Sequence, residues 1–289
     1  MDALSCALLP SSCALCGSPL PQLCSVPICT CCWLEFPLQA GPSCVRCGDT
    51  LDSPVSELNP AGSSLCRVCR LAPPPFSRAV AYGLYQGRMK AAIHALKYNR
   101  LHPAARGLGR MLAEAIAQLA QEAPAEMLVV PVPLHRKRQA DRGFNQARML
   151  ARHALEFLAK SHPQWRLTLA STTLLRQRAT ETQAGLTSRA RRINVRGAFL
   201  VPDPQAVTGK QILLIDDIFT TGATARSASQ ALLRAGAHSV WVATLARARR
   251  EVSWRPNLTE KEVTPLPGAA PGAELIEASI NSSHRQPSF

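Results

Sequence analysis

Two adjacent carboxylates followed by a hydroxyl-rich turn form the stretch with the most specific chemistry. Asp216 and Asp217 stand shortly before the turn Thr220-Thr221-Gly222-Ala223-Thr224. The backbone N–H groups of such a turn, its threonine hydroxyls and the positive end of a following helix together make a binding site for an anion. An ordinary strand-to-helix turn, in which the two aspartates cap the helix, is the alternative.

These residues need a strand before them and a helix after them. Ile212 to Ile215 is an apolar run that suits a central parallel strand buried on both faces, and we expect this strand to stop at the acids. The Ala-, Ser- and Leu-rich run 225–234 predicts a helix, with Gly236 as its stop. The acids would then emerge at the carboxyl end of a sheet, where open α/β folds bind their ligands.

The stretch 212–224 resembles the phosphoribosyl-pyrophosphate (PRPP) motif of type I phosphoribosyltransferases: four hydrophobic residues, two acids, two variable residues and Thr-Thr-Gly-x-Thr. Every position matches. The resemblance implies that Asp216 and Asp217 are the catalytic-site acids that bind the ribose hydroxyls, and that residues 220–224 hold the 5′-phosphate. The residue types suit these roles, because carboxylates accept hydroxyl protons and glycine lets the backbone approach a phosphate. A Walker-type site is excluded, since the chain has no Gly-x-x-x-x-Gly-Lys-Ser/Thr sequence.

The cysteines form a second chemical pattern, because all eleven lie between Cys6 and Cys69. Eight of them form four Cys-x-x-Cys knuckles: Cys13/Cys16, Cys29/Cys32, Cys44/Cys47 and Cys66/Cys69. Two knuckles complete the tetrahedron of thiolates that structural Zn²⁺ prefers, so four predict two zinc sites in a segment that folds on binding metal. Sequential pairing of the knuckles is the simplest arrangement, and a cross-braced pairing of alternate knuckles is the alternative.

Cys6, Cys24 and Cys31 remain, and we expect them to be spare thiols, although Cys24 could replace a ligand. A redox role for the knuckles is disfavoured, since thioredoxin-like motifs occur singly near a βαβ unit. No secretory signal is visible and no stretch approaches the length of a membrane-spanning helix. We therefore expect a cytoplasmic protein with reduced cysteines and no membrane span.

The chain is long enough, at 289 residues, for one substantial domain and a small module. Pro73-Pro74-Pro75 marks the expected boundary between a double zinc-ribbon-like tetracysteine module, 1–75, and an α/β domain, 76–250. Periodicity predicts strands at 78–85, 127–133 and 238–245, and helices at 87–97, 103–121 and 142–160. The Pro- and Gly-containing segment 251–289 has little periodicity, so we expect a mostly disordered tail.

The net charge of +14 implies an anionic partner, or only a general basicity spread over the surface. Two clusters favour a partner. One follows the strand at 127–133 and contains Arg136, Lys137, Arg138, Arg142 and Arg148, and the other runs over 176–196, with six arginines against one glutamate. Arginine is suited to bidentate contacts with phosphate. A solvated amphipathic helix is the alternative for the second cluster, and we expect His94 to be a surface or core histidine.

Together these features resemble the ComF family, the phosphoribosyltransferase-like competence proteins that include the GntX type. The resemblance covers about residues 10–248, and its elements are the four knuckles, Val130-Pro131-Val132-Pro133, Arg142-Gly143-Phe144-Asn145-Gln146, a segment from Arg176 through Gln183 to Asn194, and the PRPP motif. It implies a type I phosphoribosyltransferase fold, an α/β Rossmann-like parallel sheet with helices on both faces, preceded by a small zinc-ribbon module built on tetracysteine sites.

The resemblance also implies ligands and partners. Val132 and its neighbours would contact pyrophosphate, often through a non-proline cis peptide, and the segment 176–196 would be a flexible hood. Arg142, Arg176 and Gln183 join the turn as candidate substrate-binding residues, with Mg²⁺ accompanying PRPP and two structural Zn²⁺ ions in the knuckles. The expected partners are single-stranded DNA and competence-machinery proteins in natural transformation. A true phosphoribosyltransferase with an unidentified acceptor, and a PRPP sensor without turnover, remain alternatives.

Overall fold

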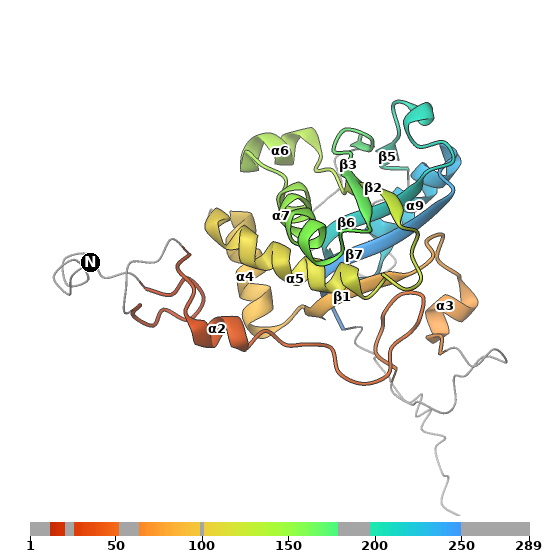
Figure 1. Cartoon of the computed structure of the whole chain (residues 1–289). Coiled ribbons are helices and arrows are strands. Elements are labelled where there is room, and N and C mark those ends of the chain that lie inside the picture. The colour runs from red at the N-terminus through yellow and green to blue at the C-terminus, as the bar shows by residue number, and fades with distance from the viewer. Residues whose placement is uncertain (1–11, 21–25, 52–63, 99–100, 179–196, 250–289) are drawn as a thin grey trace, which may run out of the picture. The chain divides into compact units, whose positions relative to one another are not determined.

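A five-stranded parallel sheet organises the α/β part of the chain (Figure 1). The computed structural model describes residues 12–20, 26–51, 64–98, 101–178 and 197–249, which all belong to one compact unit, Met1–Glu251. The strands are β1 (Ala79–Leu84), β2 (Glu126–Pro131), β3 (Arg166–Leu169), β6 (Gln211–Phe219) and β7 (Ser239–Arg247). They lie in the order β1-β7-β6-β2-β3, and all neighbouring pairs are parallel.

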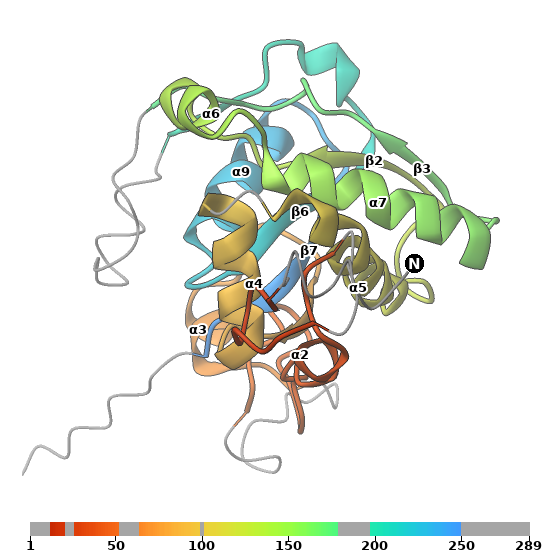
Figure 2. The ribbon, with the colours of Figure 1, turned by 90° about the vertical axis from the view of Figure 1, so that its left-hand side faces the viewer.

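Strand β6 is buried on both faces, as its apolar run predicts. Ile212 and Leu214 pack on the same side as Leu232 of α9 (Ala223–Arg234). Leu213 and Ile215 pack on the other side, with α5 (Ala105–Ala117) and α7 (Gln146–Ser161), which lie against each other (Figure 2). The expected fold class is thus confirmed: a parallel sheet covered by helices on both faces and preceded by two groups of four cysteines.

The prediction that the central strand stops at the acids is wrong. Strand β6 continues through Asp216 and Asp217 to Phe219, because β7 supplies a partner for it as far as Arg247. On its other side, the pairing with β2 ends at Ile215. The acids therefore lie where β6 keeps one neighbouring strand and has lost the other, and the sheet opens beside them.

The segment after β2 also differs from the expectation of one helix over 142–160. Residues Arg136–Arg142 form a short helix of their own, α6, which ends at Gly143 in the left-handed region (φ 76°). Helix α7 begins at Gln146, after Asn145 caps it by accepting a hydrogen bond from the backbone N–H of Arg148. Every peptide bond among the described residues is trans, so the cis peptide expected near Val132 is absent from them.

The remaining elements are the two short knuckle helices, a twelve-residue helix and several short segments. They are α2 (Thr30–Leu34), α3 (Arg67–Leu71), α4 (Gly87–Tyr98), the 3-10 turns η1 (His102–Ala104) and η2 (Pro204–Ala206), and a small antiparallel pair, β4 (Leu175–Arg176) with β5 (Phe199–Leu200). Gln183 and most of the expected hood, Cys6, Cys24 and the tail 251–289 lie outside the described residues. No helix in the described ranges is long and apolar enough to cross a membrane.

Candidate functional site

The carboxyl ends of β2 and β6 border a cavity of about 570 Å³. Helix α7 carries the chain from β2 to β3 on one face of the sheet, whereas α9 carries it from β6 to β7 on the other face. The connections thus leave these two neighbouring strands in opposite directions. A crevice at such a reversal point is where open parallel sheets bind ligands.

The cavity brings together residues from four separate segments. Of the sequence-predicted site residues, it is lined by Val132, Arg142, Arg176, Asp216, Asp217, Thr220 and Thr224. Thr221, Gly222 and Ala223 lie between two of these but are not themselves lining residues, and Gln183 is outside the described part of the chain. Further lining residues, which were not predicted as site residues, are Tyr85, Lys90, His94, Lys97, Tyr98, Asn145 and Gln146.

The two acids differ sharply in their surroundings. Asp217 is 6% exposed and forms an ion pair with the ammonium of Lys97 from α4. Burial alone would raise the pKa of Asp217, but the charge of Lys97 and its hydrogen bond lower it below the usual value. Burial also favours the neutral form of Lys97, yet the facing carboxylates raise its pKa. The pair is therefore held in its ionised form.

Asp216 is shifted in the opposite direction. Burial and the nearby charge of Asp217 raise the pKa of Asp216 to about 8, although the charge of Lys97 opposes this. Its Oδ1 atom accepts a hydrogen bond from the backbone N–H of Asp217 at 2.9 Å. Two adjacent acids with opposite pKa shifts thus offer one ionised carboxylate and one carboxyl group that is protonated near neutral pH, a pair able to accept and donate hydrogen bonds.

The turn after the acids has the conformation of a helix entrance. Gly222 has a φ of 74° and precedes the first residue of α9. A Cβ atom at this position would lie 2.6 Å from the ring of Phe219, so glycine is required both by the backbone and by the space. The hydroxyl of Thr221 accepts a hydrogen bond from the N–H of Ala223 at 3.4 Å. The turn thus presents backbone N–H groups at the positive end of a twelve-residue helix.

Cationic side chains complete the cavity. Arg176 is 9% exposed, and burial together with the charge of Arg138 lowers its pKa. Arg142 donates a hydrogen bond to the Tyr98 hydroxyl at 3.0 Å and lies 4.9 Å from the centre of its ring. Tyr98 in turn contacts the His94 ring in a tilted arrangement, with 4.7 Å between ring centroids. Arginines facing two acids across one cavity suit a ligand that carries both hydroxyl groups and phosphates.

Gln146 is a further polar group at the cavity wall. It is 5% exposed, and within the described part of the chain its Oε1 atom has no hydrogen-bond partner. Its neighbour Asn145 donates from Nδ2 to the carbonyl of Val132 at 3.0 Å, which holds the loop after β2 against α7. The expected contact of Val132 with a ligand remains a prediction, but its position on the cavity wall is compatible with it.

The eight knuckle cysteines come together in sequential groups. Group 1 is Cys13/Cys16/Cys29/Cys32 and group 2 is Cys44/Cys47/Cys66/Cys69, with all sulfur atoms of a group within 4.8 Å of one another. The cross-braced alternative is not adopted. Cys31 is exposed and belongs to neither group.

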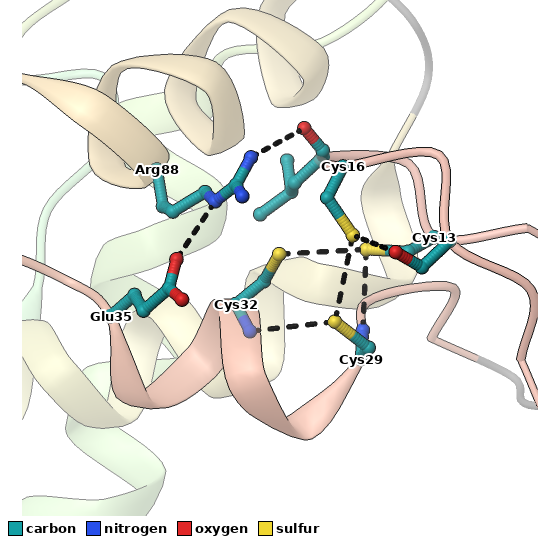
Figure 3. Close-up of polar contacts among 8 residues, drawn as sticks. Cys13, Cys16, Cys29, Cys32, Glu35 and Arg88 are labelled. Atoms are coloured by element: carbon teal, nitrogen blue, oxygen red, sulfur yellow. Dashed lines mark hydrogen bonds and ion pairs between the residues drawn. The ribbon is translucent and has the colours of Figure 1, made fainter.

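The sulfur geometry tests whether zinc fits. Zn–S bonds of about 2.3 Å in a tetrahedron separate the sulfur atoms by about 3.8 Å. The Sγ atoms of Cys13 and Cys32 are 3.8 Å apart, and those of Cys16 and Cys29 are 3.7 Å apart (Figure 3). In group 2, the Sγ atoms of Cys47 and Cys66 are 3.7 Å apart. Both groups have the donors and the spacing for a tetrathiolate zinc ion.

Several known proteins are similar to this chain in sequence or structure. No protein-family model matches the chain. The DNA utilization protein YhgH of Salmonella typhi is 33% identical over 241 residues, which cover 83% of this chain and 98% of that protein. Competence protein F of Haemophilus influenzae is 28% identical over 214 residues, which cover 73% of this chain and 87% of that protein. A solved structure of the allosteric regulatory enzyme of purine biosynthesis matches with a TM-score of 0.30 and 23% identity over 50% of this chain and 26% of that one.

Proposed function

The chain belongs to the ComF family, and from that premise we propose that its central cavity binds PRPP together with Mg²⁺. One observation carries the proposal: Asp216 and Asp217 share a single cavity with Thr220, Thr224 and Arg176. The acids would hydrogen-bond the two ribose hydroxyls, the turn would hold the 5′-phosphate, and the arginines would face the diphosphate.

The donor set at the cavity is compatible with Mg²⁺ that arrives on the ligand. Among the described residues, only the two cysteine groups bring three or more metal-binding side chains within reach of one ion, so no protein cage for Mg²⁺ exists there. Mg²⁺ keeps several waters and commonly binds through one or two carboxylates and the oxygens of a phosphorylated substrate. Bound in this way, it would offset the negative charge of the diphosphate.

Calorimetry with zinc-loaded protein tests this function. We expect saturable binding of PRPP in the presence of Mg²⁺, and its loss in the Asp216→Asn/Asp217→Asn variant. A Lys160→Met variant, altered in the last turn of α7 away from the cavity lining, is the matched control and should bind as the wild type does. Absence of binding heat in the wild type, at ligand concentrations up to the millimolar range, would exclude a PRPP site.

We further propose that the protein handles incoming single-stranded DNA in the cytoplasm during natural transformation. The proposal is consistent with the names of two relatives, a DNA utilization protein and a competence protein. The supporting feature is helix α6, whose Arg136 and Lys137 are exposed and do not line the cavity. Such cations can contact a DNA backbone without disturbing a PRPP site. Competence-machinery proteins are the expected partners in this role.

Fluorescence anisotropy of a labelled oligonucleotide, measured against salt concentration, tests DNA binding. If Arg136 and Lys137 each contact a phosphate, the Arg136→Gln/Lys137→Gln variant should lower the slope of log K against log salt by about 1.4, since each single-strand phosphate contact contributes about 0.7. PRPP binding should not change. Equal slopes for the two proteins would show that Arg136 and Lys137 make no contact with DNA phosphates.

Turnover is the second candidate function. The supporting observation is that α4 also lines the cavity, where its residues Lys90, His94 and Tyr98 are available to contact an acceptor beside PRPP. A true phosphoribosyltransferase would release pyrophosphate only when the acceptor is added. PRPP binding without pyrophosphate release, for any acceptor in a screen of nucleobases, amines and oligonucleotides, would favour a PRPP sensor instead.

A further inference from the structure

Arg247, at the end of β7, joins cysteine group 2 to the strand that carries the acids. Its guanidinium donates to the carbonyl oxygen of Cys47 and to its Sγ atom, the latter at 3.5 Å. It also forms an ion pair with Asp49 at 3.2 Å, one residue past the knuckle glycine. Arg247 is 2% exposed and Asp49 is 8% exposed, so these contacts are shielded from water. The same guanidinium lies 4.5 Å from the ring centroid of Phe219, the last residue of β6.

Phe219 transmits this contact to the turn. Arg247 and Phe219 are paired residues of neighbouring strands, and the carbonyl of Phe219 accepts a hydrogen bond from the backbone N–H of Ala248 at 2.9 Å. The Phe219 ring fills the space in which Gly222 would carry a Cβ atom. The ring also makes an edge-to-face contact with Phe76, at 6.0 Å between centroids. The ring therefore contacts the Arg247 guanidinium and lies against the turn at Gly222.

A second connection runs from group 2 to the first turn of α9. Arg226 donates to the carbonyl oxygens of Ala72 and Pro73, at 2.7 and 3.1 Å. Ala72 is the residue that ends α3, the helix that begins after Cys66 and contains Cys69. Helix α9 is thus held next to the same cysteine group that Arg247 of β7 contacts.

Group 1 has a different environment, which provides an internal control. Cys13 and Cys32 pack in the hydrophobic cluster formed with α4 and α5, whereas group 2 packs in the cluster that contains Phe219 and Ala225. Arg88 at the start of α4 holds group 1 by donating to Glu35 at 3.0 Å and to the carbonyl of Leu15 at 3.2 Å (Figure 3). Arg88 thus connects group 1 to α4 through Glu35 and Leu15, although it is more exposed than Arg247 and donates to none of the described cysteines.

We propose that Arg247 is a positioning residue through which cysteine group 2, when it holds its metal, fixes the conformation of the Thr220–Thr224 turn. This inference rests on the proposed function in one respect, because it takes this turn to be the phosphate site. The cysteines of group 2 would hold the metal ion, which would order the Cys44/Cys47 knuckle when bound. The knuckle holds the Arg247 guanidinium through Cys47, and the guanidinium contacts the Phe219 ring that lies against Gly222. The contacts of Arg88 connect group 1 to α4 instead, on the other side of the sheet from Phe219.

Amide hydrogen exchange of the full-length, zinc-loaded chain tests the proposal without any ligand. In Arg247→Met, we expect the peptide covering residues 218–226 to exchange roughly tenfold faster or more, while core peptides of α5 and α7 keep their exchange rates. Arg247→Lys should restore part of the protection, because it keeps a cation beside Asp49. Arg88→Met should leave the peptide 218–226 unchanged. A purely global loss of stability would instead accelerate the core peptides as well.

Two results would overturn the proposal. One is unchanged exchange of the peptide 218–226 in Arg247→Met with both zinc ions retained. The other is unchanged exchange of that peptide in wild-type protein whose group 2 has lost its zinc, a result that decides the matter if Arg247→Met does not fold. Loss of zinc from group 2 is identified by alkylation and peptide mapping of its cysteines, Cys44, Cys47, Cys66 and Cys69. Failure of PRPP to bind the wild type would refute the proposed function alone, since the exchange difference does not depend on PRPP.

Reciprocity provides a second measurement. If the metal of group 2 stabilises the turn, a ligand on the turn must stabilise the metal by the same factor. Saturating PRPP with Mg²⁺ should therefore raise the zinc affinity of group 2, measured by equilibrium competition with a chromogenic chelator, and leave the zinc affinity of group 1 unchanged. This increase should disappear in Arg247→Met. An equal increase for both groups would contradict the assignment of the coupling to Arg247.

Discussion

The Lys97 ammonium and the Asp217 carboxylate form a largely buried ion pair at the base of the cavity, with side chains 16% and 8% exposed. They come from α4 and β6, which are separated by more than a hundred residues of sequence. The pair keeps Asp217 ionised while Asp216 beside it is shifted towards its neutral form. The site therefore has its charges arranged before a ligand arrives, which lowers the cost of binding one.

Removing the ammonium should destabilise the protein. Lys97→Met leaves Asp217 as a buried carboxylate without its cation, so we expect a loss of about 2 to 4 kcal/mol in the free energy of unfolding, measured by urea titration. Lys90→Met is the matched control, because Lys90 also lies on α4 and lines the cavity but is exposed. It should change the unfolding free energy by less than about 0.5 kcal/mol. Equal effects would show that the ion pair has no special role.

The pH dependence of stability should reveal Asp216. Its pKa in the folded protein is about 8 against an ordinary 3.8, so the folded state binds more protons than the unfolded state between these values. Stability must then fall as pH rises from about 4 to 8. Asp216→Asn removes this titration and should be more stable than the wild type at pH 8, by a few kcal/mol as an order of magnitude. Asp217 has a lowered pKa, so the stabilisation of the folded state by its ionised carboxylate is present at neutral pH and is lost only on acidification.

Unfolding curves at pH 5 and pH 8 measure this difference. The gap between Asp216→Asn and the wild type should widen towards pH 8. Parallel behaviour of the two proteins over this range would mean that Asp216 titrates normally.

Gly222→Ala separates the effect of backbone conformation from that of the Phe219 ring. The variant forces a Cβ atom to within 2.6 Å of the ring and also occupies a φ of 74°. Gly209 has a similar φ of 70°, but a Cβ atom added there would meet no other atom within 4 Å, so Gly209→Ala carries the backbone cost alone. We expect Gly209→Ala to lose about 1 kcal/mol and Gly222→Ala clearly more, with weaker PRPP binding only in the latter. Equal losses of stability in the two variants would mean that the Phe219 ring moves aside at little cost.

Zinc content should follow the two cysteine groups. We expect two zinc ions per chain by metal analysis, and one in Cys69→Ser, because serine replaces a thiolate of group 2. Cys31→Ser should keep both, since Cys31 is exposed and outside the groups. Loss of zinc in Cys31→Ser would show that this residue is a ligand.

Local patterns in the sequence predicted much of the fold. The spacing of the knuckles predicted the two cysteine groups, because each pair of ligands lies within one turn. The apolar run 212–215 predicted a strand buried on both faces for the same reason: the information lies in neighbouring residues. The end of that strand was not predictable from it, since β6 continues only because β7 offers partners up to Arg247.

Contacts between distant segments could not be predicted from the sequence. Lys97 carries no motif that pairs it with Asp217, and Asp49 is 198 residues away from Arg247 in the chain. Both pairs depend on how the helices and knuckles pack on the sheet. For the Lys97–Asp217 pair the only signal was indirect: an apolar run directly followed by two acids requires some cation or ligand to compensate a buried charge.

A crystal structure of the zinc-loaded protein with PRPP and Mg²⁺ tests the central proposal most directly. The ribose hydroxyls should lie within hydrogen-bonding distance of the carboxyl groups of Asp216 and Asp217. The 5′-phosphate should accept hydrogen bonds from the backbone N–H groups of the turn Thr220–Thr224. PRPP bound with its phosphate elsewhere, or an empty cavity in crystals grown at ligand concentrations that saturate a calorimetric titration, would contradict it.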